Sequence, residues 1–162
     1  MEKLEWLQSY SGQSTEGLIS LESRYRVPSL VLAFEQAISQ KALREPINDV
    51  EVTVLSIEAL EREVNNGGYR QFFINTPQFV QSILPSLERV GCKQTTQITR
   101  RAIDALGAPT LQSATVHSAA LADDSSRDRE LRACDDLYYN NEEPIALSLF
   151  AFIKSNRDRI KI

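Results

Sequence analysis

Residues 63–75 read EVNNGGYRQFFIN, and this stretch decides the fold. The run Asn-Asn-Gly-Gly at positions 65–68 is a strong helix-ending signal, because asparagine and glycine accept the left-handed backbone that closes a helix. Aromatic residues then recur at helical spacing, so we predict a sharp turn after which the chain re-enters the core at once. The residues expected to build this corner are Glu63, Asn65, Asn66, Gly67, Gly68, Tyr69, Gln71, Phe72 and Asn75.

The helix that leads into the corner is predicted to run from about Val50 to Asn65. One apolar stripe includes Val54, and a second, on nearly the opposite side, includes Leu55, so this helix is expected to pack against neighbours on both sides. Glu63 falls between the stripes, where a carboxylate is costly to bury unless it accepts hydrogen bonds. We expect the free backbone amides of residues 65–69 to donate them. The alternative is a functional carboxylate with a perturbed pKa.

The rest of the chain follows the same helical period. Glycine, proline and capping residues bound further helices at about 27–43, 76–90, 93–106, 110–121, 125–140 and 144–156. No long segment alternates with a period of two, so no sheet is expected. The predicted fold is all-α, an irregular bundle of about seven or eight helices in one domain over residues 1–162.

The two ends of the chain give weaker patterns. In residues 1–26, Leu4, Trp6, Leu7 and Tyr10 fit one short amphipathic helix, and a second short piece follows near Leu18. We expect this segment to be loosely attached to the domain. Residues 157–162 are expected to fray.

Composition bounds the class of protein. The chain has 162 residues, 42% of them hydrophobic and 25% charged, which is typical of a globular domain with a real core. No window is long and apolar enough for a membrane span, and the N-terminus lacks a signal-peptide pattern, so we expect a cytoplasmic protein. Cys92 and Cys134 are expected to be small core residues rather than a disulfide.

The charge is unevenly distributed. The net charge is −4, but carboxylates concentrate in residues 45–63 and 123–143, whereas the last residues are basic. Acidic blocks repel nucleic acid and attract basic partners, and no basic-aromatic stripe supports direct nucleic-acid binding. The simplest interpretation of the acidic blocks is solvated helix faces.

Residue chemistry indicates no catalytic, cofactor-binding or metal site. His117 is the only histidine, which excludes multi-histidine metal sites, and its neighbours do not form a catalytic triad pattern. The Asp123-Asp124 and Asp135-Asp136 pairs lack the spacing of a calcium-binding EF-hand loop.

The block at 63–75 resembles the signature E-x-N-N-G-G-[FY]-x-Q-F-F-x-N of a bacterial, all-helical family typified by a DNA mimic protein. The resemblance continues through LERVGC at 87–92, the helix end at 103–107 and DDLYY at 135–139, and covers about residues 50–155. It implies a small cytoplasmic protein that engages other proteins by presenting carboxylates as DNA presents phosphates.

The leading hypothesis is therefore a non-enzymatic interaction module that occupies a DNA-binding or other basic protein, with its acidic surface joined across a homodimer. Such a module needs closely spaced negative charge on one surface. The residues predicted to form this contiguous acidic face are Glu51, Glu58, Asp124, Asp128 and Glu142.

Two other hypotheses remain open. An immunity or antitoxin protein that neutralises a basic toxin would use the same kind of acidic surface. A small hydrolase-like enzyme would instead place a concave, water-filled pocket at the corner, lined by Glu63, Asn65, Tyr69 and Gln71.

Overall fold

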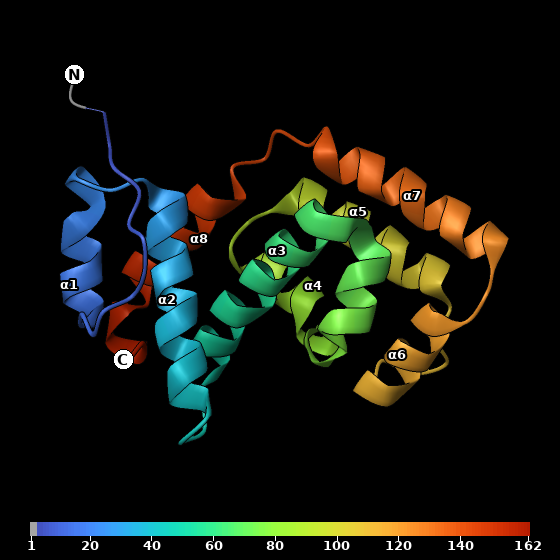
Figure 1. Ribbon diagram of the computed structural model, residues 1–162, viewed down its shortest axis with the longest axis horizontal. Helices are drawn as coiled ribbons and strands as arrows, with labels where there is room; N and C mark the ends of the chain where they lie inside the picture. The colour runs from blue at the N-terminus through green and yellow to red at the C-terminus, as the bar shows by residue number, and fades with distance from the viewer. Residues whose placement is uncertain (1–2) are drawn as a thin grey trace. The chain divides into compact units, whose positions relative to one another are not determined.

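The computed structural model describes residues 3–162, which form helices and connecting loops (Figure 1). Within these residues there is no strand, and a single isolated bridge pairs Glu5 with Tyr25. This confirms the predicted all-α class. The α-helices are α1 Thr15–Ser20, α2 Val27–Ala42, α3 Asp49–Asn75, α4 Val80–Arg89, α5 Lys93–Leu106, α6 Ser113–Leu121, α7 Ser125–Tyr139 and α8 Ile145–Ser155. Short 3-10 turns lie at Leu21–Ser23, Pro77–Phe79 and Arg157–Arg159.

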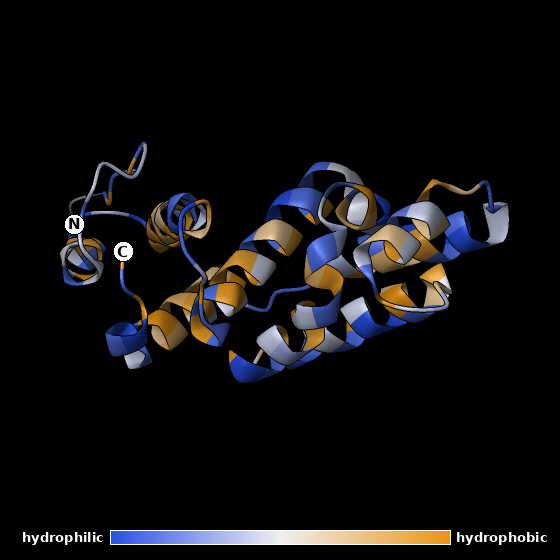
Figure 2. Ribbon diagram, turned by 90° about the horizontal axis from the view of Figure 1, so that it is seen from below, coloured by the Kyte–Doolittle hydropathy of each residue, from blue (hydrophilic) through white to orange (hydrophobic). Residues whose placement is uncertain are grey.

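The chain divides into two compact units. Unit 1 contains residues 3–58 and 144–162 of the described chain, and unit 2 contains residues 59–143. Hydrophobic and hydrophilic residues occupy different sides of most helices, as amphipathic packing requires (Figure 2). No helix in the part of the chain described here has the length and hydrophobicity that a membrane crossing needs.

Unit 1 packs α2 against α8, with α1 alongside α2 (Figure 1). Its fully buried side chains include Leu18, Leu30 and Phe34. The last residues of the chain belong to this packing. The Thr15 hydroxyl donates to the Ile160 carbonyl at 2.6 Å, and Ile160 is only 2% exposed. The expected fraying of residues 157–162 is therefore wrong, because a buried isoleucine and a long-range hydrogen bond fix the tail.

The first residues of unit 1 also differ from expectation. Residues 3–13 form no helix; the Glu5 amide donates to the Arg24 carbonyl, and the Arg26 amide donates to the Glu5 carbonyl. The Leu7 amide donates to the Ser29 hydroxyl at 3.0 Å. Pairing with distant groups satisfies this extended backbone, so the predicted helix at residues 4–10 is wrong.

Unit 2 packs α5 against α7 and α4 against α5 (Figure 1). The predicted bounds of the helix at 93–106 are confirmed, and Gly107 ends it in the left-handed conformation with φ 65°. Pro85 lies inside α4 and does not split it. The N-cap of α7 is Asp124, whose side chain accepts the Arg127 amide.

Candidate functional site

The corner is a kink inside α3 rather than the end of a helix. Gly67 (φ −159°, ψ 15°) and Gly68 (φ 81°, ψ −179°) leave the helical conformation, and helix resumes to Asn75. Glu63, 8% exposed, accepts hydrogen bonds at 2.9 Å from the side-chain amides of both Gln71 and Asn75. Its carboxylate thus joins the two arms of the kink. The donors are side chains of the second arm, not the turn amides that we expected.

The pKa of Glu63 reflects this bonding. Burial raises the pKa, but hydrogen bonds from Gln71, Asn75 and Arg62 outweigh burial and hold it below its ordinary value. The carboxylate is therefore charged at neutral pH and is held by donors within the protein. A β-carbon at Gly67 would lie 1.9 Å from Gln71 Oε1, so the missing side chain leaves the space through which Gln71 reaches Glu63.

Asp135 of α7 closes the other side of the kink. The Tyr69 amide donates to Asp135 Oδ1 at 2.7 Å. A β-carbon at Gly68 would lie 2.4 Å from Asp135 Oδ2, so glycine is needed there both for its positive φ and for this close approach. Tyr69 is fully buried and its hydroxyl lies 2.8 Å from Thr99 Oγ1.

The predicted enzyme pocket has no counterpart in this packing. Glu63 and Gln71 are bonded to each other, Tyr69 is buried, and the Asn65 amide donates to the Glu61 carbonyl. Glu63, Tyr69 and Gln71 are thus packed or bonded within the protein and Asn65 is exposed at the surface, which counts against the hydrolase hypothesis.

Beside the corner, α7 adds an aromatic pair that sequence reasoning did not single out as a site. The Tyr138 hydroxyl donates to the half-buried Glu61 carboxylate, and the Tyr139 hydroxyl donates to the Val64 carbonyl at 2.7 Å. Burial raises the pKa of Glu61 to about 7. The side chain of Tyr139 itself remains 51% exposed.

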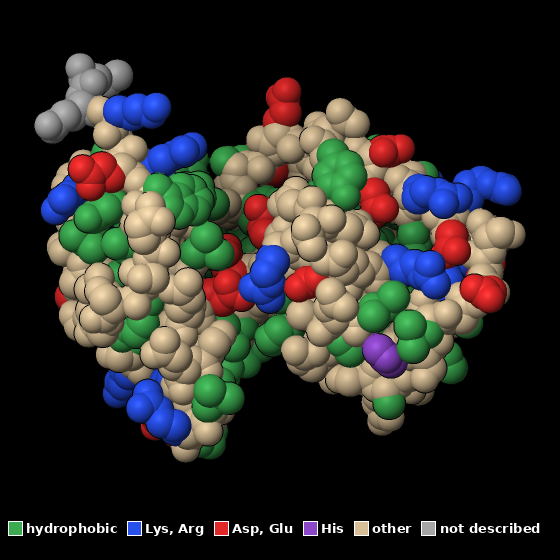
Figure 3. Space-filling view, in the orientation of Figure 1, with side chains coloured by type: hydrophobic (Ala, Val, Ile, Leu, Met, Phe, Trp, Pro, Cys, Tyr) green, Lys and Arg blue, Asp and Glu red, His purple; other side chains and the backbone are tan. Residues whose placement is uncertain are grey.

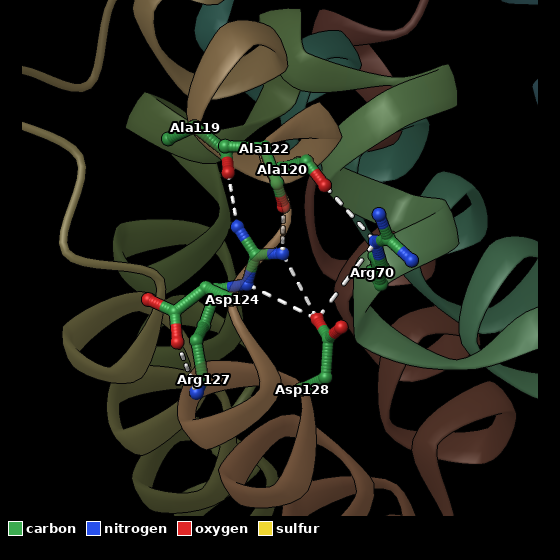
Figure 4. Close-up of polar contacts among 7 residues, drawn as sticks. All are labelled: Arg70, Ala119, Ala120, Ala122, Asp124, Arg127 and Asp128. Carbon is green, nitrogen blue, oxygen red and sulfur yellow. Dashed lines mark hydrogen bonds and ion pairs between the residues drawn. The ribbon is translucent and has the colours of Figure 1, made fainter.

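Two residues predicted for the acidic face, Asp124 and Asp128, serve the junction of α6 and α7 (Figure 4). Asp124 caps α7. The buried Arg127 donates to the Ala119 and Ala122 carbonyls at the end of α6 and to Asp128 Oδ1. Arg70 Nε donates to the Ala120 carbonyl and lies 3.9 Å from Asp128 Oδ1. Hydrogen bonds from Arg127 hold the pKa of Asp128 below its ordinary value. The charge of the Asp128 carboxylate is thus balanced within the protein.

Two further residues of the predicted acidic face, both glutamates of α3, are buried. Glu51 is 0% exposed and accepts from Lys41 Nζ at 2.6 Å, from the Asn48 amide at 3.1 Å and from the Lys161 amide. Glu58 is 5% exposed. The prediction that these two residues lie on an exposed surface is therefore wrong. Glu51 instead fixes the loop before α3 and the end of the chain.

Glu142 is exposed, but it lies beyond the C-terminal end of α7, whereas Asp124 lies at its start. A helix of 15 residues is roughly 22 Å long, so these two carboxylates are far apart. On the face drawn in Figure 3, acidic and basic side chains are interspersed. The five predicted residues therefore do not form one contiguous acidic face.

Four exposed carboxylates of unit 2 form neither a salt bridge nor a side-chain hydrogen bond within residues 3–162: Asp104, Asp123, Asp136 and Glu142. Asp104 lies on α5, and the other three lie on α7 and its two flanking loops. Asp123 and Asp136 were missed as site residues because each is the neighbour of another aspartate, and the sequence does not say which one bonds internally.

The remaining candidate groups are structural in character. His117 is half-buried, and its Nδ1 lies 2.9 Å from the Ile74 carbonyl oxygen. Cys92 and Cys134 are free and buried, which confirms that they do not form a disulfide. Among the residues that the structure describes, no group of histidine, cysteine and carboxylate side chains is arranged to hold a metal ion.

Fold and corner together define an all-helical protein whose signature residues brace a kinked central helix. Residues 45–156 match the model of the DMP19-like protein family, and the chain belongs to this family. The match confirms the resemblance seen in the sequence. No relative among curated proteins and no solved structure matched the chain.

Proposed function

We propose that the chain is a non-enzymatic protein-interaction module of the DNA-mimic type, which occupies a basic surface of a DNA-binding protein. Membership of the DMP19-like family, which is not a known enzyme family, supports this proposal. The observation that carries it is the set of exposed carboxylates without an internal cation on α7 and its two flanking loops, Asp123, Asp136 and Glu142. A basic partner can pair with these groups without breaking a bond inside the protein.

The magnitude of the charge limits the kind of mimicry. Duplex DNA carries one negative charge per ~1.7 Å, or roughly 13 over the length of α7, against these three carboxylates. Three ion pairs at an exposed surface steer and orient a partner more than they hold it. The binding surface therefore needs uncharged contacts too, and α7 offers the exposed Leu137 and Tyr139 beside Asp136.

Affinity capture from cells of the native host tests the proposal. The baits are the wild type, the variant Asp136→Asn/Glu142→Gln and the matched control Glu45→Gln/Asp158→Asn, which removes two exposed carboxylates from unit 1. We expect the wild type and the control to capture a basic DNA-binding protein that added duplex DNA displaces, and the first variant to capture less of it. Capture that neither DNA nor the Asp136/Glu142 change affects would refute the proposal.

A further inference from the structure

Helices α5 and α7 lie side by side in unit 2 (Figure 1). Side chains of α5 and of the C-terminal end of α7 line a groove. This groove has a volume of about 520 Å³. It is lined by Gln94, Gln97, Ile98 and Arg101 of α5 and by Leu137, Asn140 and Asn141 at the end of α7. A further hollow of about 490 Å³ continues past Arg101, between Gln97 and Glu130.

The lining combines an apolar contact with uncharged polar groups. Leu137 is 44% exposed and Ile98 is half-buried, so together they offer a surface for one aliphatic side chain. Gln94 and Gln97 are exposed, and their side-chain amides make no hydrogen bond within the described chain. A primary amide is both a donor and an acceptor, which matches the peptide group.

The side-chain amides of Gln94 and Gln97 indicate which backbone conformation a segment bound in this groove would have. A helical partner has already paired its interior N–H and C=O groups along its own axis, so it would leave Gln94 and Gln97 without partners. An extended segment presents both groups sideways. Gln94 to Arg101 spans roughly 10 Å of helix, which is about three residues of extended chain.

The charges around the groove determine which residues of the bound peptide can flank its aliphatic side chain. Arg101, the cation in the groove lining, donates to Glu130 at 2.6 Å and is neutralised by it. At the Leu137 end, Asp136 and Glu142 are exposed carboxylates next to lining residues, and Lys93 is the cation adjacent to Gln94. Two exposed carboxylates against one exposed lysine favour a peptide segment with basic residues.

We propose that the α5–α7 groove binds an extended peptide segment of a partner protein, in which an aliphatic side chain packs on Leu137 and Ile98 and flanking Lys or Arg residues pair with Asp136 and Glu142. This deepens the proposed function and rests on it, because it specifies which element of a basic partner is bound. Gln94 and Gln97 then bond the backbone of that segment.

The probes are three capped pentapeptides, Lys-Lys-Leu-Lys-Lys, Lys-Lys-Ser-Lys-Lys and Glu-Glu-Leu-Glu-Glu, titrated into the ¹⁵N-labelled full chain and followed by NMR. We expect the first to shift the signals of Gln94, Gln97, Ile98 and Leu137. The serine peptide should bind about tenfold more weakly, because it lacks the buried leucine. The acidic peptide should bind more weakly still.

Variants decide whether the groove is the site. Leu137→Ala should weaken the lysine-leucine peptide about tenfold, whereas Leu147→Ala, at a 57% exposed leucine of α8, should not. Equal binding of the three peptides, shifts outside the groove, or groove signals that move with protein concentration alone would overturn the inference. If the peptides fail but host capture still depends on Asp136 and Glu142, the inference falls and the proposed function stands.

Discussion

Replacing Gly68 with alanine tests the account of the corner most sharply. The backbone at Gly68 (φ 81°, ψ −179°) lies in a region that residues with side chains rarely adopt, at a cost of about 1–3 kcal/mol. The new β-carbon would also meet Asp135 Oδ2 at 2.4 Å and displace the carboxylate that accepts the Tyr69 amide. Losing a hydrogen bond to a charged group adds about 1.5–3 kcal/mol. We expect Gly68→Ala to destabilise the protein by about 3–5 kcal/mol.

Urea unfolding followed by far-UV circular dichroism measures this loss. With a slope of about 2 kcal/mol per molar urea, the midpoint should fall by about 1.5–2.5 M. Gly91→Ala is the matched control, because Gly91 also has a positive φ (78°) but a β-carbon there meets nothing within 4 Å. In an Asp135→Ala background, the cost of Gly68→Ala should fall toward that of the control. A Gly68→Ala variant no less stable than Gly91→Ala would refute the reasoning.

Three further substitutions test individual buried groups. Burial raises the pKa of Glu61 from 4.5 to about 7, so between these pH values the native state binds more protons than the unfolded state. The free energy of unfolding should therefore fall by about 2–3 kcal/mol as the pH rises from about 5 to about 8. Urea titrations at the two pH values should show this loss for the wild type and not for Glu61→Gln. Glu51→Ala should cost about 3 kcal/mol in the same assay because Lys41 loses its buried partner, against under about 0.5 kcal/mol for exposed Glu45→Ala. Arg127→Met should lower the thermal midpoint and speed hydrogen exchange at the end of α6, and a variant as protected as the wild type would contradict its capping role.

The sequence predicts those features of the fold that depend on neighbouring residues. The bounds of α5 followed from glycines just outside each end, and the start of α8 followed from Pro144. The position of the corner also follows from local chemistry, because glycine tolerates the positive φ at position 68, whereas the contact of Gly68 with Asp135 is not visible in the local sequence. The donors that brace the corner were nevertheless predicted wrongly, although Glu63, Gln71 and Asn75 lie within 12 residues, because the expected turn amides are replaced by side-chain amides of the second arm.

The other errors arose where partners are distant in the sequence. From the sequence alone, Glu51 has the pattern of a surface carboxylate. In the structure it accepts a hydrogen bond from the amide of Lys161, which lies 110 residues away. The spacing of Leu4 and Trp6 fits a helix as well as it fits an extended segment. The segment is extended because the backbone of Glu5 forms hydrogen bonds with residues 24 and 26. For the same reason, a pattern of acidic residues could not show which carboxylates are free.

The central claim is that unpaired carboxylates at α7, not the corner, bind a basic partner. Calorimetric titration of the captured partner into three proteins tests it most directly: the wild type, Asp136→Asn/Glu142→Gln and the control Glu45→Gln/Asp158→Asn. We expect the Asp136/Glu142 variant to bind about tenfold more weakly and with a smaller salt dependence, at about 0.7 kcal/mol per lost ion pair, while the control binds like the wild type. Equal affinities for all three proteins, or equal losses in both variants, would contradict the account.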